Sequence, residues 1–169
     1  MAEHVVQVGY SDLNRYTNDE PYHADNEYYL LKLLQDNWNK DNSQGITPVF
    51  YLTNKEISHD LSTAPAIKVF QNNEDSTAIG LGFIAKRMKL LMNIELLTLD
   101  RTLLFDTKEE IVRILDFCRK RPIPEWDFIY TTNIKRMDPR AGNYHIMIQA
   151  VIERLVKPIP GTTLFPAEQ

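Results

Sequence analysis

The stretch Lys89-Leu-Leu-Met-Asn-Ile-Glu-Leu-Leu-Thr98 decides the fold of this chain. Apolar residues at every second position are typical of a β-strand with one buried face, namely Leu90, Met92, Ile94 and Leu96. Polar residues occupy most of the alternate positions, but Leu91 and Leu97 interrupt them. We therefore expect the second face of this strand to be partly covered, by this chain or by another copy of it.

The segment after this strand predicts an amphipathic helix. It begins at Thr107-Lys-Glu-Glu110, where the Thr hydroxyl caps an early helix N–H and Glu110 reaches back to the N–H of the cap residue. Apolar residues then recur at helical spacing, at Ile111, Ile114, Leu115 and Cys118. Pro122 is expected to end the helix. A strand followed by such a helix needs further strands to complete a layer.

The rest of the chain predicts one more helix and four more strands. The helix covers residues 26–38, follows Asp25 as its cap, and has a stripe of Leu30, Leu31, Leu34 and Trp38. The strands are predicted over residues 48–53, 65–70, 125–132 and 144–156. The polar run Gln71 to Ser76 is predicted to be the tip of a long hairpin, and residues 138–143 a turn.

The order helix-strand-strand-strand-helix-strand-strand predicts an α+β domain over residues 25–158. Both helices are expected to pack on one face of an antiparallel or mixed β-sheet. Residues 1–24 are predicted to be an N-terminal arm, with a short strand over residues 5–8 as an alternative, and residues 159–169 a C-terminal tail. Four apolar residues off the main register favour burial of the second sheet face against another subunit: Leu91, Leu97, Met147 and Val151.

Composition indicates one soluble globular domain. The chain has 169 residues, of which 43% are hydrophobic and 25% charged. The single cysteine, Cys118, lies in the apolar stripe of a predicted helix and is interpreted as a core residue. The first residues show no basic segment followed by an apolar run, and no stretch is long and uncharged enough to span a bilayer. We expect a cytosolic protein, or one assembled from the cytosol into something larger.

The charge is distributed unevenly along the chain. Residues 1–85 hold 5 Lys and Arg against 12 Asp and Glu, a net of −7, whereas residues 86–169 hold 14 against 11, a net of +3. This asymmetry favours head-to-tail self-association or a charged partner, with two solvated faces of unequal charge as the alternative. The dense basic stripe with interleaved aromatic residues that is typical of nucleic-acid binding is absent from the sequence.

No catalytic, metal-binding or cofactor-binding residue is predicted from motifs. The four histidines, His4, His23, His59 and His145, have no spacing that would make a metal site on one helix or hairpin. The sequence holds no Gly-x-Ser-x-Gly elbow and no Walker loop. Its charged groupings, Asp100-Arg101 and Asp138 near Arg136 and Arg140, are interpreted as turn residues and surface ion pairs.

One segment supports an alternative function as an enzyme. The run Ala78-Ile-Gly-Leu-Gly-Phe-Ile-Ala-Lys-Arg-Met-Lys-Leu-Leu91 resembles the phosphate-cradling turn and helix of the GNAT acetyltransferases. That resemblance implies an acyl-CoA-dependent N-acetyltransferase, in which backbone N–H groups at a helix N-terminus hold the pyrophosphate of coenzyme A. The later Asn and Tyr-x-x-Gly-Phe signature of that family is missing from this chain.

The whole pattern over residues 25–158 resembles the tail-completion or tail-terminator proteins of tailed viruses. The resemblance depends on the order of elements rather than on one signature. The segments that carry it are Pro65 to Phe70, the Gly80-Leu-Gly82 turn, Lys89 to Thr98 with Asp100-Arg101, the helix from Thr107 to Arg119, Asn133 to Asp138, and Tyr144 to Ala150.

This resemblance implies a structural virion protein without an active site or cofactor. Its subunits would form a ring, commonly a hexamer, at the neck between head and tail, assembled in the host cytoplasm. Partners would be the tail tube protein and the head-completion or connector protein, with DNA passing through the lumen without sequence-specific binding and no membrane involved. The implied subunit or partner contacts are Lys86, Arg87, Lys89, Arg101, Lys135, Arg136 and Arg140. The implied lumen or tube-end loop is Asn72, Asn73, Glu74 and Asp75.

Overall fold

A computed structural model describes residues 6–7, 26–52, 55–79, 85–124, 126–140 and 142–156. Two α-helices, one 3₁₀ helix and six strands lie in these ranges. In chain order they are β1 (Val6–Gln7), α2 (Asn26–Asp36), the 3₁₀ helix η2 (Lys40–Ser43), β2 (Val49–Leu52), β3 (Ala66–Ile79), β4 (Ala85–Thr98), α3 (Arg101–Phe117), β5 (Phe128–Arg140) and β6 (Asn143–Val156). Apart from Val6 and Gln7, the predicted arm and tail lie outside the described residues.

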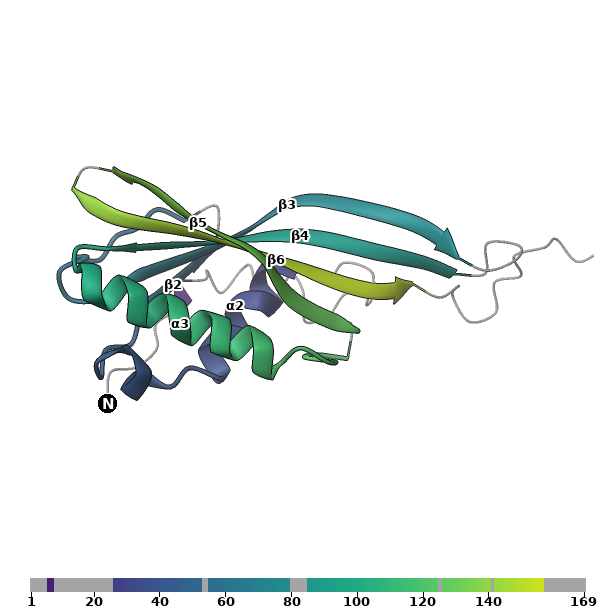
Figure 1. Ribbon diagram of the computed structural model, residues 1–169, viewed down its shortest axis with the longest axis horizontal. Coiled ribbons are helices and arrows are strands. Elements are labelled where there is room, and N and C mark those ends of the chain that lie inside the picture. Colours follow the sequence, from purple (N-terminus) through teal and green to yellow (C-terminus); the bar gives the residue numbers. More distant parts are fainter. Residues whose placement is uncertain are drawn as a thin grey trace, which may run out of the picture.

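The strands form one mixed sheet in the order β1-β2-β3-β4-β6-β5. The pairs β1–β2 and β2–β3 are parallel, and the other three pairs are antiparallel. Both helices pack against the same face of this sheet (Figure 1). The predicted α+β class, with two helices against a mixed sheet, is therefore confirmed, as is the antiparallel pairing of the last two strands.

The core lies between the helices and the inner face of the sheet. On β4 the residues Leu90, Met92, Ile94 and Leu96 are fully buried, as their alternation predicts. They meet the apolar stripes of both helices in a single cluster that also holds Phe50 and Trp126. Burial of each large apolar side chain contributes about 1.5–3 kcal/mol, so this layer holds the helices on the sheet.

The start of α3 differs from the prediction. The cap is Asp100, whose Oδ1 accepts a hydrogen bond of 2.9 Å from Leu103 N, so the helix begins almost two turns before Thr107. Thr107 is buried in the middle of the helix. The predicted capping box was wrong because Asp100, in extended conformation two residues after β4, satisfies the free N–H of Leu103 and starts the helix earlier in the chain.

Glu110, assigned to that capping box, instead joins α3 to the segment after α2. Its side chain is 1% exposed. It accepts hydrogen bonds from Asn39 N at 2.8 Å and Asn42 Nδ2 at 2.7 Å, and Arg113 contacts both of its oxygens, at 2.8 Å from Nε and 2.6 Å from Nη2. Burial raises the pKa of this carboxyl, but the hydrogen bonds from Arg113, Asn39 and Asn42 outweigh burial and lower the pKa of Glu110 overall.

Two loop predictions were wrong because the strands are longer than their apolar cores. Residues 71–76 lie inside β3, where Asp75 pairs with Lys89 and Ser76 with Met88. The connection between β3 and β4 falls on residues 80–84, outside the described residues, together with Gly80 and Gly82. The predicted turn over residues 138–143 is shorter, since β5 continues to Arg140 and β6 starts at Asn143, after Gly142 at φ +79°.

The antiparallel strands are also longer than the helices that cover them. Strands β3, β4 and β6 have 14 residues each, which corresponds to about 45 Å of extended chain. Helix α3 has 17 residues and helix α2 has 11, about 25 and 16 Å. One end of the sheet, formed by β3, β4 and the end of β6, therefore extends past the helical layer (Figure 1).

Replacement of Glu110 tests the link between α3 and the α2 segment. We expect Glu110→Ala to lower the free energy of unfolding by about 3 kcal/mol, because a buried carboxylate with several charge-assisted hydrogen bonds is lost. Urea denaturation measures this change. Glu109→Ala is the matched control, since the neighbouring Glu109 is 68% exposed and its ion pair with Lys108 contributes at most about 1 kcal/mol. Equal losses in the two variants would contradict this role of Glu110.

The lowered pKa of Glu110 also predicts a dependence of stability on pH. A carboxyl whose pKa is depressed by folding contributes stability above its ordinary pKa of 4.5, and loses it as the pH falls through the folded-state value. We expect the free energy of unfolding to fall more steeply below pH 4.5 in the wild type than in Glu110→Gln. Thermal unfolding of both proteins between pH 7 and pH 3 measures the difference, and parallel curves would contradict the assignment.

Candidate functional site

The outer face of the sheet, opposite the helices, is partly covered by the chain itself. Ile57 and Leu61, in the connection between β2 and β3, pack on a small cluster of Tyr51, Ala66 and Leu97. Leu97 was expected to be buried by another subunit, and this part of the expectation was wrong, since a loop of its own chain lies over it. The apolar residue at position 97 predicted that this strand face is covered. The sequence did not predict which segment covers it.

A hydrogen-bonded pair of side chains fixes this loop. The Tyr51 hydroxyl lies 2.5 Å from His59 Nδ1 and accepts hydrogen bonds from the backbone N–H groups of Ser58 and His59. The rings of Tyr51 and His59 stack with centroids 5.6 Å apart, and His59 Nε2 lies 2.9 Å from Ala64 O. A neutral imidazole protonated at Nε2 satisfies both contacts, so His59 has a structural role in closing the loop.

The remainder of the outer face combines apolar and polar side chains. Leu91, Met147 and Val151 are half-buried, and no described helix or strand packs over them. His145 is buried beside Glu95, with Nε2 and Oε1 2.8 Å apart. These three apolar residues were expected at a subunit interface. Their burial by another subunit stays a prediction.

The outer edge of β3 is acidic, and we call Asn72, Asn73, Glu74 and Asp75 the acidic edge. Strand β2 pairs only with residues 66–69 of β3. From residue 70 to 79, no described strand lies on the outer side of β3. Glu27 Oε1 accepts a hydrogen bond from Gln71 N, and the acidic edge that follows is exposed. These four residues are brought together on a strand edge rather than on a loop.

The opposite edge of the sheet is formed by β5, and we call Lys135 and Arg136 the basic edge. The first residues of β5 are covered, because Ile129 N donates to Arg119 O and Phe128 pairs with Lys120. Beyond them, no described strand lies on the outer side of β5. Lys135 and Arg136 are exposed; the backbone of Arg140 ends the strand, and its side chain is outside the description.

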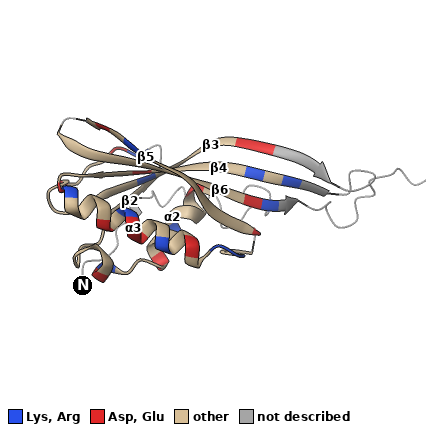
Figure 2. Cartoon of the chain, viewed as in Figure 1, with Lys and Arg blue, Asp and Glu red and all other residues tan. Residues whose placement is uncertain are grey.

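The two edges lie at opposite ends of the sheet. Asp75 is level with Lys89, Glu153 and the beginning of β5, whereas Lys135 is level with Met147, Glu95 and Lys68. Figure 2 shows the acidic segment of β3 towards one end and the basic segment of β5 towards the other. Three antiparallel pairings separate β3 from β5, so the two strands run antiparallel to one another.

The other expected contact residues do not join either edge. Lys86, Arg87 and Lys89 lie on β4 inside the sheet, and Lys89 Nζ pairs with Glu153 Oε1 at 3.4 Å. Arg101 is the first residue of α3, with its guanidinium 5.9 Å from the ring centroid of Phe105. The seven predicted contact residues therefore form three separate groups. One lies on the central strand β4, one at the β5 edge and one at the start of α3.

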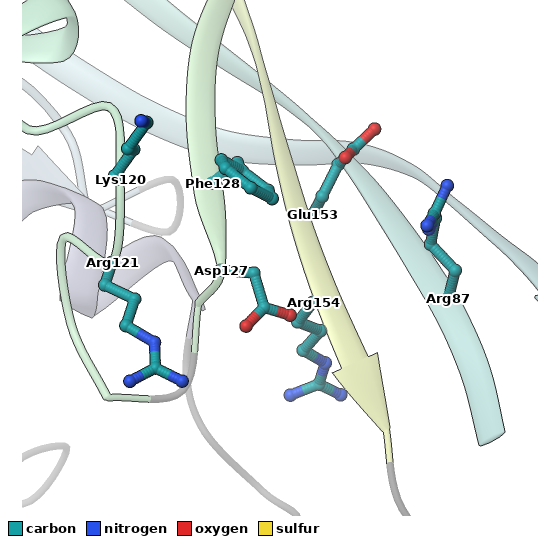
Figure 3. A pocket seen from close by; sticks show the side chains of 7 residues that line it. All are labelled: Arg87, Lys120, Arg121, Asp127, Phe128, Glu153 and Arg154. Carbon is teal, nitrogen blue, oxygen red and sulfur yellow. The ribbon is translucent and has the colours of Figure 1, made fainter.

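A basic hollow lies where α3 connects to β5 (Figure 3). It has a volume of about 710 Å³ and is lined by Arg87, Lys120, Arg121, Asp127, Phe128, Glu153 and Arg154. Only Arg87 was named from the sequence. The run Arg119-Lys-Arg121 before Pro122 was a signal for the others, but sequence spacing does not bring that run next to Arg87 and Arg154.

The geometry does not support the phosphate cradle of the acetyltransferase alternative. That cradle needs a helix N-terminus after the glycine turn, whereas residues 85–88 begin β4. The turn itself, residues 80–84, lies outside the described residues. The predicted helix of this resemblance is thus replaced by a strand, because Arg87 and Met88 continue the ladder with Thr77 and Ser76.

Two further features are absent from the described residues, a metal-binding cluster and a membrane-spanning helix. Within those ranges, no group of three or more His, Cys, Asp and Glu side chains could hold a metal ion. The helices found there are too short or too polar to cross a membrane. Cys118 is half-buried at the end of α3, and burial raises the pKa of its thiol, which keeps it protonated near neutral pH.

No protein-family model matches the chain, and no curated protein matches its sequence.

The Tyr51–His59 pair predicts a local effect on the loop over the outer face. We expect Tyr51→Phe to lower the free energy of unfolding by about 1–2 kcal/mol, because it removes the hydroxyl that contacts His59 and two backbone N–H groups. Amide exchange at Ser58 and His59 should become faster than in the wild type. Tyr144→Phe is the control, since Tyr144 is half-buried and the described residues give its hydroxyl no hydrogen bond. Unchanged exchange at Ser58 and His59 would contradict the role of the pair.

Proposed function

We propose that this chain is a structural protein of a tailed virus, a tail-completion or tail-terminator protein that forms a ring at the junction of head and tail. One observation carries the proposal. Two of the strand edges that have no described strand partner differ in charge, one being acidic on β3 and one basic on β5. Two different and complementary patches on each subunit are what a closed head-to-tail ring uses.

Charge determines which edges can meet. An exposed strand edge offers unpaired backbone groups to another strand, and charged side chains on it oppose pairing with an edge of the same sign. Two acidic edges repel each other, as do two basic edges. Pairing of Glu74 and Asp75 with Lys135 and Arg136 of the next copy is favoured instead. Each subunit then uses its acidic edge towards one neighbour and its basic edge towards the other. Such contacts close a ring and do not form an isologous dimer.

The positions of the edges are compatible with ring closure. Along the sheet, the level of Asp75 and the level of Lys135, which is that of Lys68, are about 20 Å apart in extended chain. Pairing the two edges shifts each subunit along the strands relative to its neighbour. A closed sheet requires such a stagger, because its strands tilt with respect to the axis.

The outer sheet face and the extended end of the sheet would have places in such a ring. Half-buried Leu91, Met147 and Val151 supply apolar area on the face that the helices leave open. The end of the sheet past the helices can reach a neighbour or the end of a tube (Figure 1). The tail tube and the head-completion protein would be the partners, and DNA would pass through the lumen.

Reversal of the charges tests the proposed ring. We expect the wild type to form rings with a central hole wide enough for duplex DNA, seen by negative-stain microscopy and by mass from light scattering. Glu74→Lys/Asp75→Lys and Lys135→Glu/Arg136→Glu should each weaken assembly at least tenfold, about 1.4 kcal/mol, because like charges then face each other. Mixing the two variants should restore rings of alternating subunits, because each β3 edge then meets a β5 edge of opposite charge, and combining all four changes in one chain should restore them as well.

The control reverses two charges away from the edges. Lys32→Glu/Lys40→Glu changes exposed residues of α2 and η2 and should leave ring formation unchanged. A monomer at every concentration, or rings in both edge variants as in the wild type, would contradict the proposed assembly. Failure of the combined variant to recover would contradict direct pairing of the two edges.

A further inference from the structure

The outer face of the sheet carries its side chains in regular levels. Successive side chains of a strand point to opposite faces, and Leu90, Met92 and Ile94 of β4 point into the core under the helices. The residues of β4 that point outwards are therefore Lys89, Leu91, Asn93 and Glu95. The strand register places one outward residue of β3, β6 and β5 beside each of them. This part of the outer face thus has four levels across the sheet.

Two of the levels are charged, and their net charges are opposite. The basic level consists of Lys68, Glu95, Met147 and Lys135, which gives two lysines, one glutamate and a net of +1. The acidic level consists of Asp75, Lys89, Glu153 and Phe128, which gives two carboxylates, one lysine and a net of −1. Figure 2 shows the acidic segment of β3 beside basic residues of β4. The two levels together carry no net charge that would oppose contact with a second copy.

The two levels between them carry an apolar band, which consists of Phe70, Leu91, Tyr130 and Val151. Phe70 lies beside Asn93, and the other three share the next level. All four are half-buried, and no described helix or strand packs over them. An apolar centre with charged residues around it is the usual composition of a contact between proteins.

The order of the levels determines how a second copy can lie on this face. With a two-fold axis along the strands, each level meets its own level, and Lys68 faces Lys135 of the other copy. With the axis across the strands and through the apolar band, the basic level meets the acidic level. Lys68 then faces Asp75 of the other copy and Glu95 faces Lys89, and symmetry makes each pair occur twice. Charge complementarity therefore selects the axis across the strands.

The loop between β2 and β3 is compatible with the same arrangement. It packs on the outer face one level beyond Lys68. The corresponding position of the other copy, one level beyond Asp75, is occupied by Arg87 of β4. Arg87 is exposed, as are Glu56 and Asp60 of the loop. Opposite charges therefore meet at the end of the contact as well.

We propose that two copies of this chain pack face to face through the outer sheet face, with β4 of one copy antiparallel to β4 of the other. The apolar band forms the centre of the contact, and the pairs Lys68–Asp75 and Lys89–Glu95 border it. The contact uses side chains of the face rather than backbone groups of the strand edges. It therefore goes beyond the proposed ring and does not depend on it.

The available area predicts a contact of moderate strength. Four strands about 4.8 Å apart, each about 24 Å long over the four levels, present about 450 Å² per copy and about 900 Å² for two copies. Contacts of this size are at the low end of specific interfaces. We expect a dimer that dissociates on dilution.

Cross-linking at position 91 tests the arrangement. In a Cys118→Ser background, Leu91→Cys places one thiol of each copy beside the two-fold axis, within about 10 Å of the other, because packed sheets lie about 10 Å apart. We expect a short bismaleimide to give a dimer whose yield rises with protein concentration. Val151→Cys, at the same level on β6, is a second reporter should the first variant not fold.

The control for cross-linking lies on the helical side of the molecule. Phe117, at the end of α3, is 77% exposed, and Phe117→Cys in the same background should give little dimer. In the edge-paired ring, three strands separate the β4 strands of neighbouring copies, so the ring alone does not link position 91. No cross-linked dimer from either reporter, or equal yields at positions 91 and 117, would overturn the proposal.

Charge variants on β3 separate the face from the edge. In the cross-linking background, Lys68→Glu and Asp75→Lys should each raise the concentration needed for half-maximal cross-linking about tenfold, because like charges then meet twice. An equal mixture of the two variants should recover the wild-type value, since every pair in the mixed dimer again joins opposite charges. No recovery in the mixture would contradict the proposed axis.

The matched control changes the same charge on the neighbouring residue of the strand. Glu74 pairs with the inward-facing Leu90 and therefore points to the other face of the sheet. Glu74→Lys should leave cross-linking unchanged, and thermal unfolding identifies any variant that has lost its fold. An effect of Glu74→Lys equal to that of Asp75→Lys would overturn the assignment to the face. Ring formation is followed separately by microscopy, so failure of the ring and failure of the face contact are distinguishable.

Discussion

The difference in length between strands and helices is the constraint on which the rest of the structure depends. Three antiparallel strands of 14 residues extend about 45 Å, whereas the longer helix covers about 25 Å of that length. The inner face under the helices is fully buried at Leu90, Met92, Ile94 and Leu96. The rest of the sheet therefore has to present strand edges and half-buried apolar residues to its surroundings.

Two polar contacts link the helices to the segments beside them. Glu110 binds the segment after α2 through Asn39 and Asn42, and Asn26, at the start of α2, accepts a hydrogen bond from the buried Trp126 indole. On the other face, the Tyr51–His59 pair fixes the loop that covers Leu97.

Residues of the candidate surfaces were partly predictable. Glu74 and Asp75 could be named from a polar run, but their place on a strand could not, because the alternation in β3 ends where its inner face leaves the core. Arg87 could be named as a surface cation, but its neighbours in the hollow come from segments more than 30 positions away. The helix start at Asp100 was missed because two cap signals, at residues 100 and 107, compete in sequence and only packing selects between them.

The sequence by itself determined the α+β class, the central strand, the apolar stripes of both helices and the closing hairpin, because period-2 and period-3.6 patterns of apolar residues report directly on burial. Only the tertiary structure decided which polar segments extend the strands, which loop covers Leu97, and which edges stay without a strand partner among the described residues. It also brought Arg87, Arg121 and Arg154 around one hollow. These features depend on pairings between distant segments, and such pairings leave no period in the chain.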